Sequence, residues 1–155
     1  MRAYVDADHA GDKLTQRSRT GYIVFLNMAP IYWPSKKQAS IETSSLGSEF
    51  IAMKQCCEFI RGLRYKLRMM GIPVNEPTFI RGDNKSVLCN TMIPSSVLSK
   101  KSNLIAYHAV REGVARKEWV TGYIKTDYNP SNISTKSLPA GQKRDSEVSL
   151  CLYDI

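Results

Sequence analysis

The feature of this 155-residue sequence that most restricts its fold is a long apolar repeat between residues 50 and 70. Apolar side chains recur there at steps of three and four residues, which is the spacing of one face of an α-helix. The repeat consists of Phe50, Met53, Cys57, Ile60, Leu63, Leu67 and Met70. Gly71 and Pro73 end the pattern, and serine residues just before it offer N-caps. The sequence therefore predicts one long helix with a single face against a core.

A pattern of strict alternation precedes this helix. From Ala3 to Asp8 it places Tyr4, Asp6 and Asp8 on one face of a strand and the intervening apolar residues on the other. Residues 22–26 and 31–33 predict two further short strands, joined by a turn. We therefore expect an antiparallel meander whose first strand carries two carboxylates on one face.

The remaining segments alternate between helix and strand. The sequence predicts a strand at 78–81, short helices at 85–90 and 130–138, a longer helix at 104–119 and a strand at 120–125. The order is β-β-β-α-β-α-α-β-α, which predicts an α/β fold. Its mixed central sheet has about five strands, the first three antiparallel, and helices flank it. Residues 1–138 form one predicted domain, and 139–155 form a C-terminal tail that no pattern places. Trp33 and Trp119 are expected in the core.

Charge and composition restrict the class of protein. The net charge is +8 and the isoelectric point is near 9.4, which favours a polyanionic partner. Arg61, Arg64 and Arg68 line the long helix beside its apolar face as candidate nucleic-acid contacts, and the alternative is a solvated helix face. No apolar run approaches the length of a membrane span, and no signal or transit peptide is recognisable. We expect an intracellular protein, in a cytoplasmic particle or the nucleus, with no membrane partner.

Three acidic residues stand where their side chains can converge. Asp6 lies on the first strand, Glu49 near the start of the long helix and Asp83 at the end of a later strand. Converging carboxylates repel one another, so a fold tolerates them chiefly when cations lie between them. Oxygen ligands alone favour magnesium or manganese over zinc. The alternative is that the three residues share no site. Asp6 would then be an exposed strand residue, Glu49 an acid that the helix dipole favours in the first turn, and Asp83 a turn-forming residue.

At these residues the chain resembles the ribonuclease H domain of copia-type retrotransposon polyproteins. The resemblance extends from Tyr4 to about Leu138 and includes YVDADHAGD, RSRTGYIVFL, WPSKKQASIETSSLGSEFIA, GDNKSV, YHAVRE and NPSNISTKSL, in the order and at the spacing of the family. The first aspartate of the family falls on Asp6, its glutamate on Glu49 and its second aspartate on Asp83. The resemblance implies a ribonuclease H-like fold.

The resemblance also implies a chemistry, which is cleavage of the RNA strand of an RNA–DNA hybrid by two Mg²⁺ ions, for which Mn²⁺ can substitute. Asp6 would bridge both ions, and Glu49 and Asp83 would bind the ion on the nucleophile side. Asn132 would lie where the other ion is held. The implied partners are the hybrid and a reverse transcriptase domain of the same polyprotein, and we expect the isolated domain to be monomeric.

Asn132 is the departure from the family pattern that matters most. The family has a carboxylate here, in a motif similar to A-D-I-L-T-K, and asparagine keeps its shape but removes its negative charge. We therefore expect cleavage that is weakened but retained, with a greater need for magnesium. Asp127, five residues upstream, is a candidate partial ligand, and its alternative is a turn residue.

Three other classes of function require different residues from those of a ribonuclease H. A catalytically degenerate module of the same fold would bind the hybrid, or its polyprotein neighbours, without cutting, and Asn132 favours it. The segment YVDA is similar to the reverse transcriptase Y-x-D-D turn, but Ala7 separates the two aspartates. Integrases and transposases expect carboxylates in the order Asp, Asp, Glu, whereas this chain has Asp, Glu, Asp.

Overall fold

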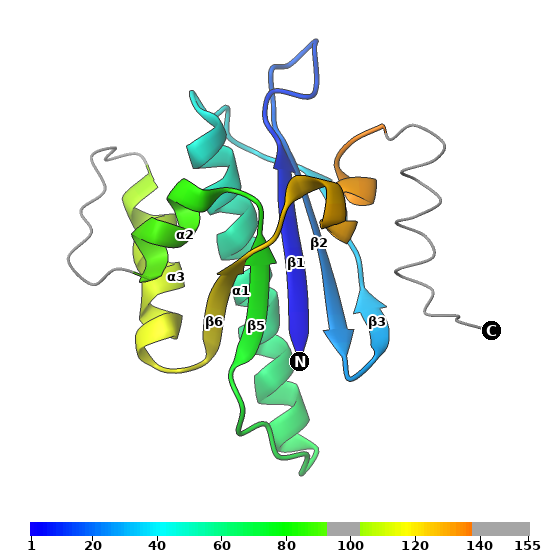
Figure 1. Cartoon of the computed structure of the whole chain (residues 1–155), viewed down its shortest axis with the longest axis vertical. Helices are drawn as coiled ribbons and strands as arrows, with labels where there is room; N and C mark the ends of the chain where they lie inside the picture. The colour runs from blue at the N-terminus through cyan, green and yellow to red at the C-terminus, as the bar shows by residue number, and fades with distance from the viewer. Residues whose placement is uncertain (93–102, 138–155) are drawn as a thin grey trace.

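A mixed sheet forms the centre of the computed structural model, which describes residues 1–92 and 103–137 (Figure 1). The strands are β1 (Arg2–Asp8), β2 (Arg19–Leu26), β3 (Ala29–Tyr32), β4 (Ser35–Lys37), β5 (Thr78–Gly82) and β6 (Trp119–Tyr123). Their order across the sheet is β3-β2-β1-β5-β6, and β4 also pairs with β2. The first three strands pair antiparallel, whereas β5 lies parallel to both β1 and β6. The expected mixed sheet is confirmed.

Within the described residues, three α-helices pack against this sheet: α1 (Ser45–Met69), α2 (Lys85–Met92) and α3 (Leu104–Ala115). In Figure 1, α1 passes behind the sheet, where it packs on β1 and β2, and α3 packs against α1. Two 3-10 helices, η2 (Thr126–Tyr128) and η3 (Pro130–Ser134), follow β6, and η3 packs on β1 and β2. The apolar residues predicted to line the long helix are largely buried, with Phe50, Ile60 and Cys57 in the core.

The predicted order of elements is confirmed up to the last helix, with two local differences. The strand β4 was not predicted because its three residues are polar and exposed and show no alternation. The helix expected at 104–119 ends at Ala115. The backbone N–H of Glu118 reaches the carbonyl of Gly113, and that of Lys117 reaches the carbonyl of Val114, while Lys117 adopts a φ of 57°. This is a helix-ending motif that usually carries glycine, so a lysine gave no sequence signal.

The last predicted helix, at 130–138, is a short 3-10 turn within the described residues. Asn129 caps it, since its side chain accepts a hydrogen bond from the backbone N–H of Ser131 and Pro130 follows at the first position. The predicted tail at 139–155 lies outside the described residues. None of the helices in 1–92 and 103–137 has the length and apolarity to span a bilayer.

The two tryptophans have opposite environments. Trp119 is buried and donates a hydrogen bond to the carbonyl of Val110 at 3.0 Å. Trp33, which was also expected in the core, is 62% exposed. That prediction was wrong because β3, which precedes Trp33, lies at the edge of the sheet, a position that the local sequence does not encode.

Gly113 provides a test of the packing of α3. A Cβ at this position would lie 1.9 Å from the Trp119 ring, so Gly113→Ala forces apart a buried contact and is expected to cost about 3 kcal/mol of unfolding free energy. Gly62, in the exposed part of α1, has open space around it, and Gly62→Ala is expected to stabilise by about 0.5 to 1 kcal/mol. Urea unfolding of both variants measures the difference, and equal midpoints would contradict this packing.

Candidate metal centre

Three carboxylates from three separate elements meet at one end of the sheet. Val5 of β1 pairs with Gly82 of the parallel strand β5, so the next residue of each chain segment, Asp6 and Asp83, comes to the same edge. Glu49 lies one turn into α1, whose start is fixed by Ser44, since the hydroxyl of Ser44 accepts a hydrogen bond from the backbone N–H of Gly47. One oxygen of each carboxylate lies within 4.8 Å of the others. The expected convergence of the three side chains is therefore present.

The electrostatics of this cluster favour a bound cation. Burial, and then the negative charges of Asp6 and Asp83, raise the pKa of Glu49 to about 9. Without a cation, Glu49 therefore holds a proton at neutral pH. The donors are oxygen atoms only, the set that Mg²⁺ and Mn²⁺ prefer, so the residues present fit such an ion.

Two residues beside Asp6 were not identified from the sequence. The ammonium of Lys136 lies 3.1 Å from Asp6 Oδ1, and the hydroxyl of Thr135 donates a hydrogen bond to Asp6 Oδ2. Asp6 is thereby buried, with 1% of its surface exposed. Both residues belong to the NPSNISTKSL segment, which also contains Asn132, and that membership is their only signal in the sequence.

Asn132 stands next to the cluster and connects to it through Lys136. Its Nδ2 donates a hydrogen bond to the carbonyl of Thr126, and its Oδ1 accepts one from the Lys136 ammonium at 3.2 Å. The first of these bonds requires an amide, because an ionised carboxylate has no donor. Asp127 is exposed and is not part of the carboxylate cluster found in the described residues.

The three arginines of α1 do not form a free basic stripe. Arg64 is buried, and its guanidinium donates to the carbonyls of Val74 and Glu76 and to the hydroxyl of Thr78. Arg61 pairs with Glu118 at 2.8 Å, and Arg68 is exposed and donates to the Val74 carbonyl. The expectation that Arg64 contacts nucleic acid is wrong, since its charged group is used inside the fold. All three also lie on the part of α1 remote from Glu49, about 18 to 28 Å along the helix.

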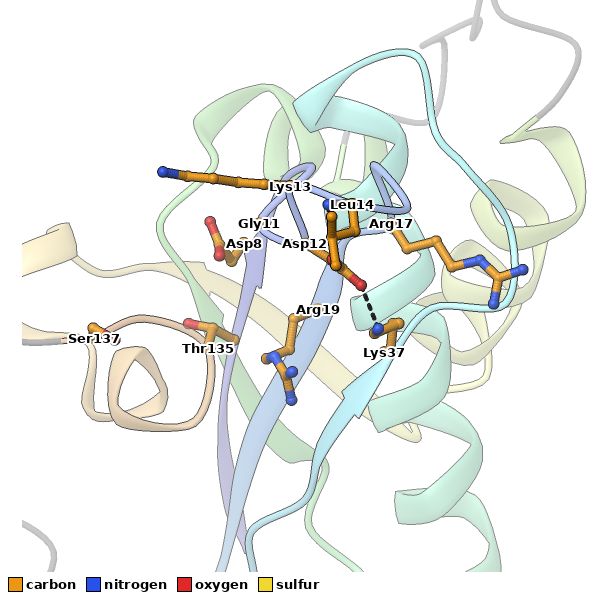
Figure 2. Close-up of a pocket in the computed structure, with 10 residues that line it drawn as sticks. All are labelled: Asp8, Gly11, Asp12, Lys13, Leu14, Arg17, Arg19, Lys37, Thr135 and Ser137. Carbon is orange, nitrogen blue, oxygen red and sulfur yellow. Dashed lines mark hydrogen bonds and ion pairs between the residues drawn. The ribbon is translucent and has the colours of Figure 1, made fainter.

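A basic pocket lies beside the carboxylate cluster (Figure 2). Its walls come from the loop between β1 and β2, from β2 and β4, and from the residues that follow η3. They include Asp8, Asp12, Lys13, Arg17, Arg19, Lys37, Thr135 and Ser137. Thr135 belongs to both places, because it lines the pocket and contacts Asp6. The pocket and the candidate metal centre are therefore neighbours.

The sequence of the chain is similar to a segment of several retrotransposon polyproteins. It is 32% identical over 140 residues to the retrovirus-related Pol polyprotein from transposon RE1 of Arabidopsis thaliana, covering 89% of this chain and 9% of the relative. It is 28% identical over 139 residues to the Pol polyprotein from transposon TNT 1-94 of Nicotiana tabacum, covering 90% of this chain and 10% of the relative. The chain thus spans about a tenth of the length of these relatives. No family model matches it.

Solved structures with a similar fold are ribonucleases H. The structure of RNase H1 from the halophilic archaeon Halobacterium salinarum matches 84% of this chain and 89% of its own, with a TM-score of 0.60 and 14% identity. LC11-RNase H1 in complex with an RNA/DNA hybrid matches 83% of this chain and 87% of its own, with a TM-score of 0.63 and 12% identity.

The fold is that of ribonuclease H. Homologues of this ribonuclease H-like chain include retrovirus-related Pol polyproteins from copia-type transposons. The resemblance noted in the sequence is therefore confirmed at the level of homology and fold.

The raised pKa of Glu49 predicts how the metal-free protein responds to pH. Because the folded pKa lies above the ordinary value of 4.5, the folded state binds more protons than the unfolded state between pH 4.5 and about 9. The unfolding free energy should therefore fall as pH rises across this range, by at least ~1 kcal/mol. Urea unfolding at pH 5, 7 and 9 in a chelator measures this fall, and Glu49→Gln should reduce it. An equal fall in the variant would place its origin elsewhere.

Proposed function

We propose that this ribonuclease H-like chain is a metal-dependent endonuclease that cleaves the RNA strand of RNA–DNA hybrids during retrotransposon reverse transcription. The observation that carries the proposal is the meeting of Asp6, Glu49 and Asp83, all within 4.8 Å, at one end of a ribonuclease H sheet. Its partner, by analogy with LC11-RNase H1, is an RNA–DNA hybrid.

In this proposal each residue of the site has a distinct task. Asp6, Glu49 and Asp83 would hold two Mg²⁺ or Mn²⁺ ions, which when bound would supply an activated water and stabilise the leaving oxygen. The hydroxyl of Thr135 orients Asp6, because it donates to one of the two carboxylate oxygens. Glu49 gives up its proton when the site is loaded, since a nearby cation favours the charged form. Asn132 positions Lys136 and contributes no negative charge.

The wider context is also a proposal, since the chain spans about a tenth of its relatives. The Pol polyproteins support a reverse transcriptase domain as neighbour in the same polyprotein, and an intracellular setting in a cytoplasmic particle or the nucleus. We further propose that the isolated domain is a monomer and that residues 1–138 contain the whole fold.

Removal of one carboxylate tests the activity. Asp83→Asn should reduce metal-dependent cleavage of a labelled hybrid by about a hundredfold or more, because it removes a charge that holds the ions. Asp127→Asn, which changes the same chemical group at an exposed site outside the cluster, should leave cleavage within about twofold. Cleavage is measured on a denaturing gel with Mg²⁺ or Mn²⁺ and against a chelator control.

The outcome of this assay also decides between the two candidate functions. Asn132 favours a module that binds hybrid without cutting, since it lowers the negative charge beside the site. Hybrid binding by the wild-type chain with no metal-dependent product would select that module. If the Asp83→Asn variant still formed cleavage product, the proposed active site would be contradicted.

Asn132 itself is open to a gain-of-function test. Asn132→Asp adds a negative charge 3.2 Å from the Lys136 ammonium and near Asp6, so it should lower the Mg²⁺ concentration needed for half-maximal cleavage by about threefold or more. The change also removes the hydrogen bond to the Thr126 carbonyl, so thermal melting must accompany the assay. An unchanged Mg²⁺ dependence in a folded variant would contradict a role for this position in metal binding.

A further inference from the structure

The basic pocket beside the candidate metal centre has a volume of about 490 Å³ and a surplus of positive charge. Four cationic side chains line it, Lys13, Arg17, Arg19 and Lys37, against the two carboxylates of Asp8 and Asp12. The hydroxyls of Thr135 and Ser137 add hydrogen-bonding groups on one wall. Its lining is therefore suited to an anion with several oxygen atoms.

One of the two carboxylates is fully engaged within the pocket wall. Asp12 pairs with Lys37, accepts the hydroxyl of Thr15 and accepts the backbone N–H groups of Leu14 and Thr15. The Lys37 ammonium and these hydrogen bonds hold the pKa of Asp12 far below its usual range. Asp12 therefore neutralises Lys37 and leaves the other cations unpaired.

The remaining cations have no carboxylate partner in the described parts of the chain. Within residues 1–92 and 103–137 no ion pair forms at Lys13, Arg17 or Arg19. Arg19 donates one hydrogen bond, to the hydroxyl of Ser35 at 3.2 Å. Figure 2 shows Lys13 and Arg17 on either side of the Asp12–Lys37 pair, with Arg19 below it. The positive charge is spread along the pocket, which suits a chain of phosphates better than a single ion.

The loop that carries these cations is held in place by its own hydrogen bonds. The backbone N–H of Gln16 reaches the carbonyl of Asp12, and the N–H of Asp12 reaches the carbonyl of Arg17. The N–H of Ala10 donates to the hydroxyl of Ser18, which is buried. Binding of an anion would therefore cost little ordering of the backbone.

The pocket adjoins the carboxylate cluster through two of its lining residues. Asp8 follows Asp6 by two residues on the same face of β1 and lines the pocket, and Thr135 contacts Asp6 from the pocket wall. A nucleic-acid strand with a phosphate at Asp6, Glu49 and Asp83 would therefore pass next to the pocket that the cations of the loop line.

We propose that this pocket binds the phosphate backbone of a nucleic-acid strand next to the cleaved bond, through Lys13, Arg17 and Arg19. The inference rests on the proposed function, and it adds the surface that sets how the strand lies across the site. Contacts from ammonium and guanidinium groups to phosphate carry no base information, so the pocket holds strands of any sequence.

Binding of a fluorescent RNA–DNA hybrid tests the pocket. Fluorescence anisotropy is measured in the Asp83→Asn background, which prevents cleavage, over a series of salt concentrations. Lys13→Ala/Arg17→Ala should weaken binding by about tenfold or more and reduce the slope of log affinity against log salt by about 2, because two phosphate contacts are lost. The same loss is expected for hybrids of unrelated sequence.

The matched control is Lys66→Ala/Arg116→Ala, which removes the same two residue types from exposed positions near the C-terminal ends of α1 and α3, at the opposite end of the sheet from Asp83. It should leave affinity within about threefold and the salt slope unchanged. Thermal melting checks that both double variants fold. An equal loss of hybrid affinity in the two double variants would overturn the inference. Binding would then depend only on the net charge of the protein and not on the position of the cations.

The failure of this inference can be told apart from that of the proposed function. If the pocket variants bind and cleave like the control while Asp83→Asn alone abolishes cleavage, the pocket is not part of the hybrid surface but the nuclease stands. If the wild-type chain neither binds nor cleaves hybrid at any salt concentration, both proposals fail.

Discussion

The parallel pairing of β1 with β5 is the constraint on which the candidate site depends. Two aspartates that are 77 positions apart become neighbours because Val5 and Gly82 share a register, and α1 then brings Glu49 to the same edge. Carboxylates so close repel one another, and this repulsion adds to burial in raising the pKa of Glu49, while the Lys136 ammonium accompanies Asp6. The packing of apolar side chains of α1 on β1 and β2 supplies the stability that makes such a cluster tolerable.

Much of this arrangement was predictable from the sequence. The alternation of Ala3 to Asp8 predicted which residues of β1 face the core, and the three-four repeat predicted α1 with nearly the right ends. The family motifs then indicated that Asp6, Glu49 and Asp83 converge, which local periodicity alone does not establish. The strand and the helix were predictable because their patterns are local in the sequence, and the three carboxylates because they lie within the family motifs.

The features that were missed depend on tertiary context. Trp33 is exposed because β3 is an edge strand, and α3 ends early because Lys117 adopts a left-handed conformation without a glycine. Thr135 and Lys136 lie next to Asp6 although 129 and 130 positions separate them from it. No spacing in the sequence reveals such a contact. The basic pocket likewise assembles from the β1–β2 loop, β4 and the segment after η3.

The burial of Arg64 has a consequence for how related sequences are compared. Its guanidinium joins α1 to the segment that leads into β5, through hydrogen bonds to two carbonyls and one hydroxyl. A lysine has a single ammonium group and cannot reproduce this planar geometry, so an exchange that looks conservative would loosen the approach to β5. An arginine at this position in related sequences would therefore reflect selection for the fold. It would not by itself indicate nucleic-acid recognition.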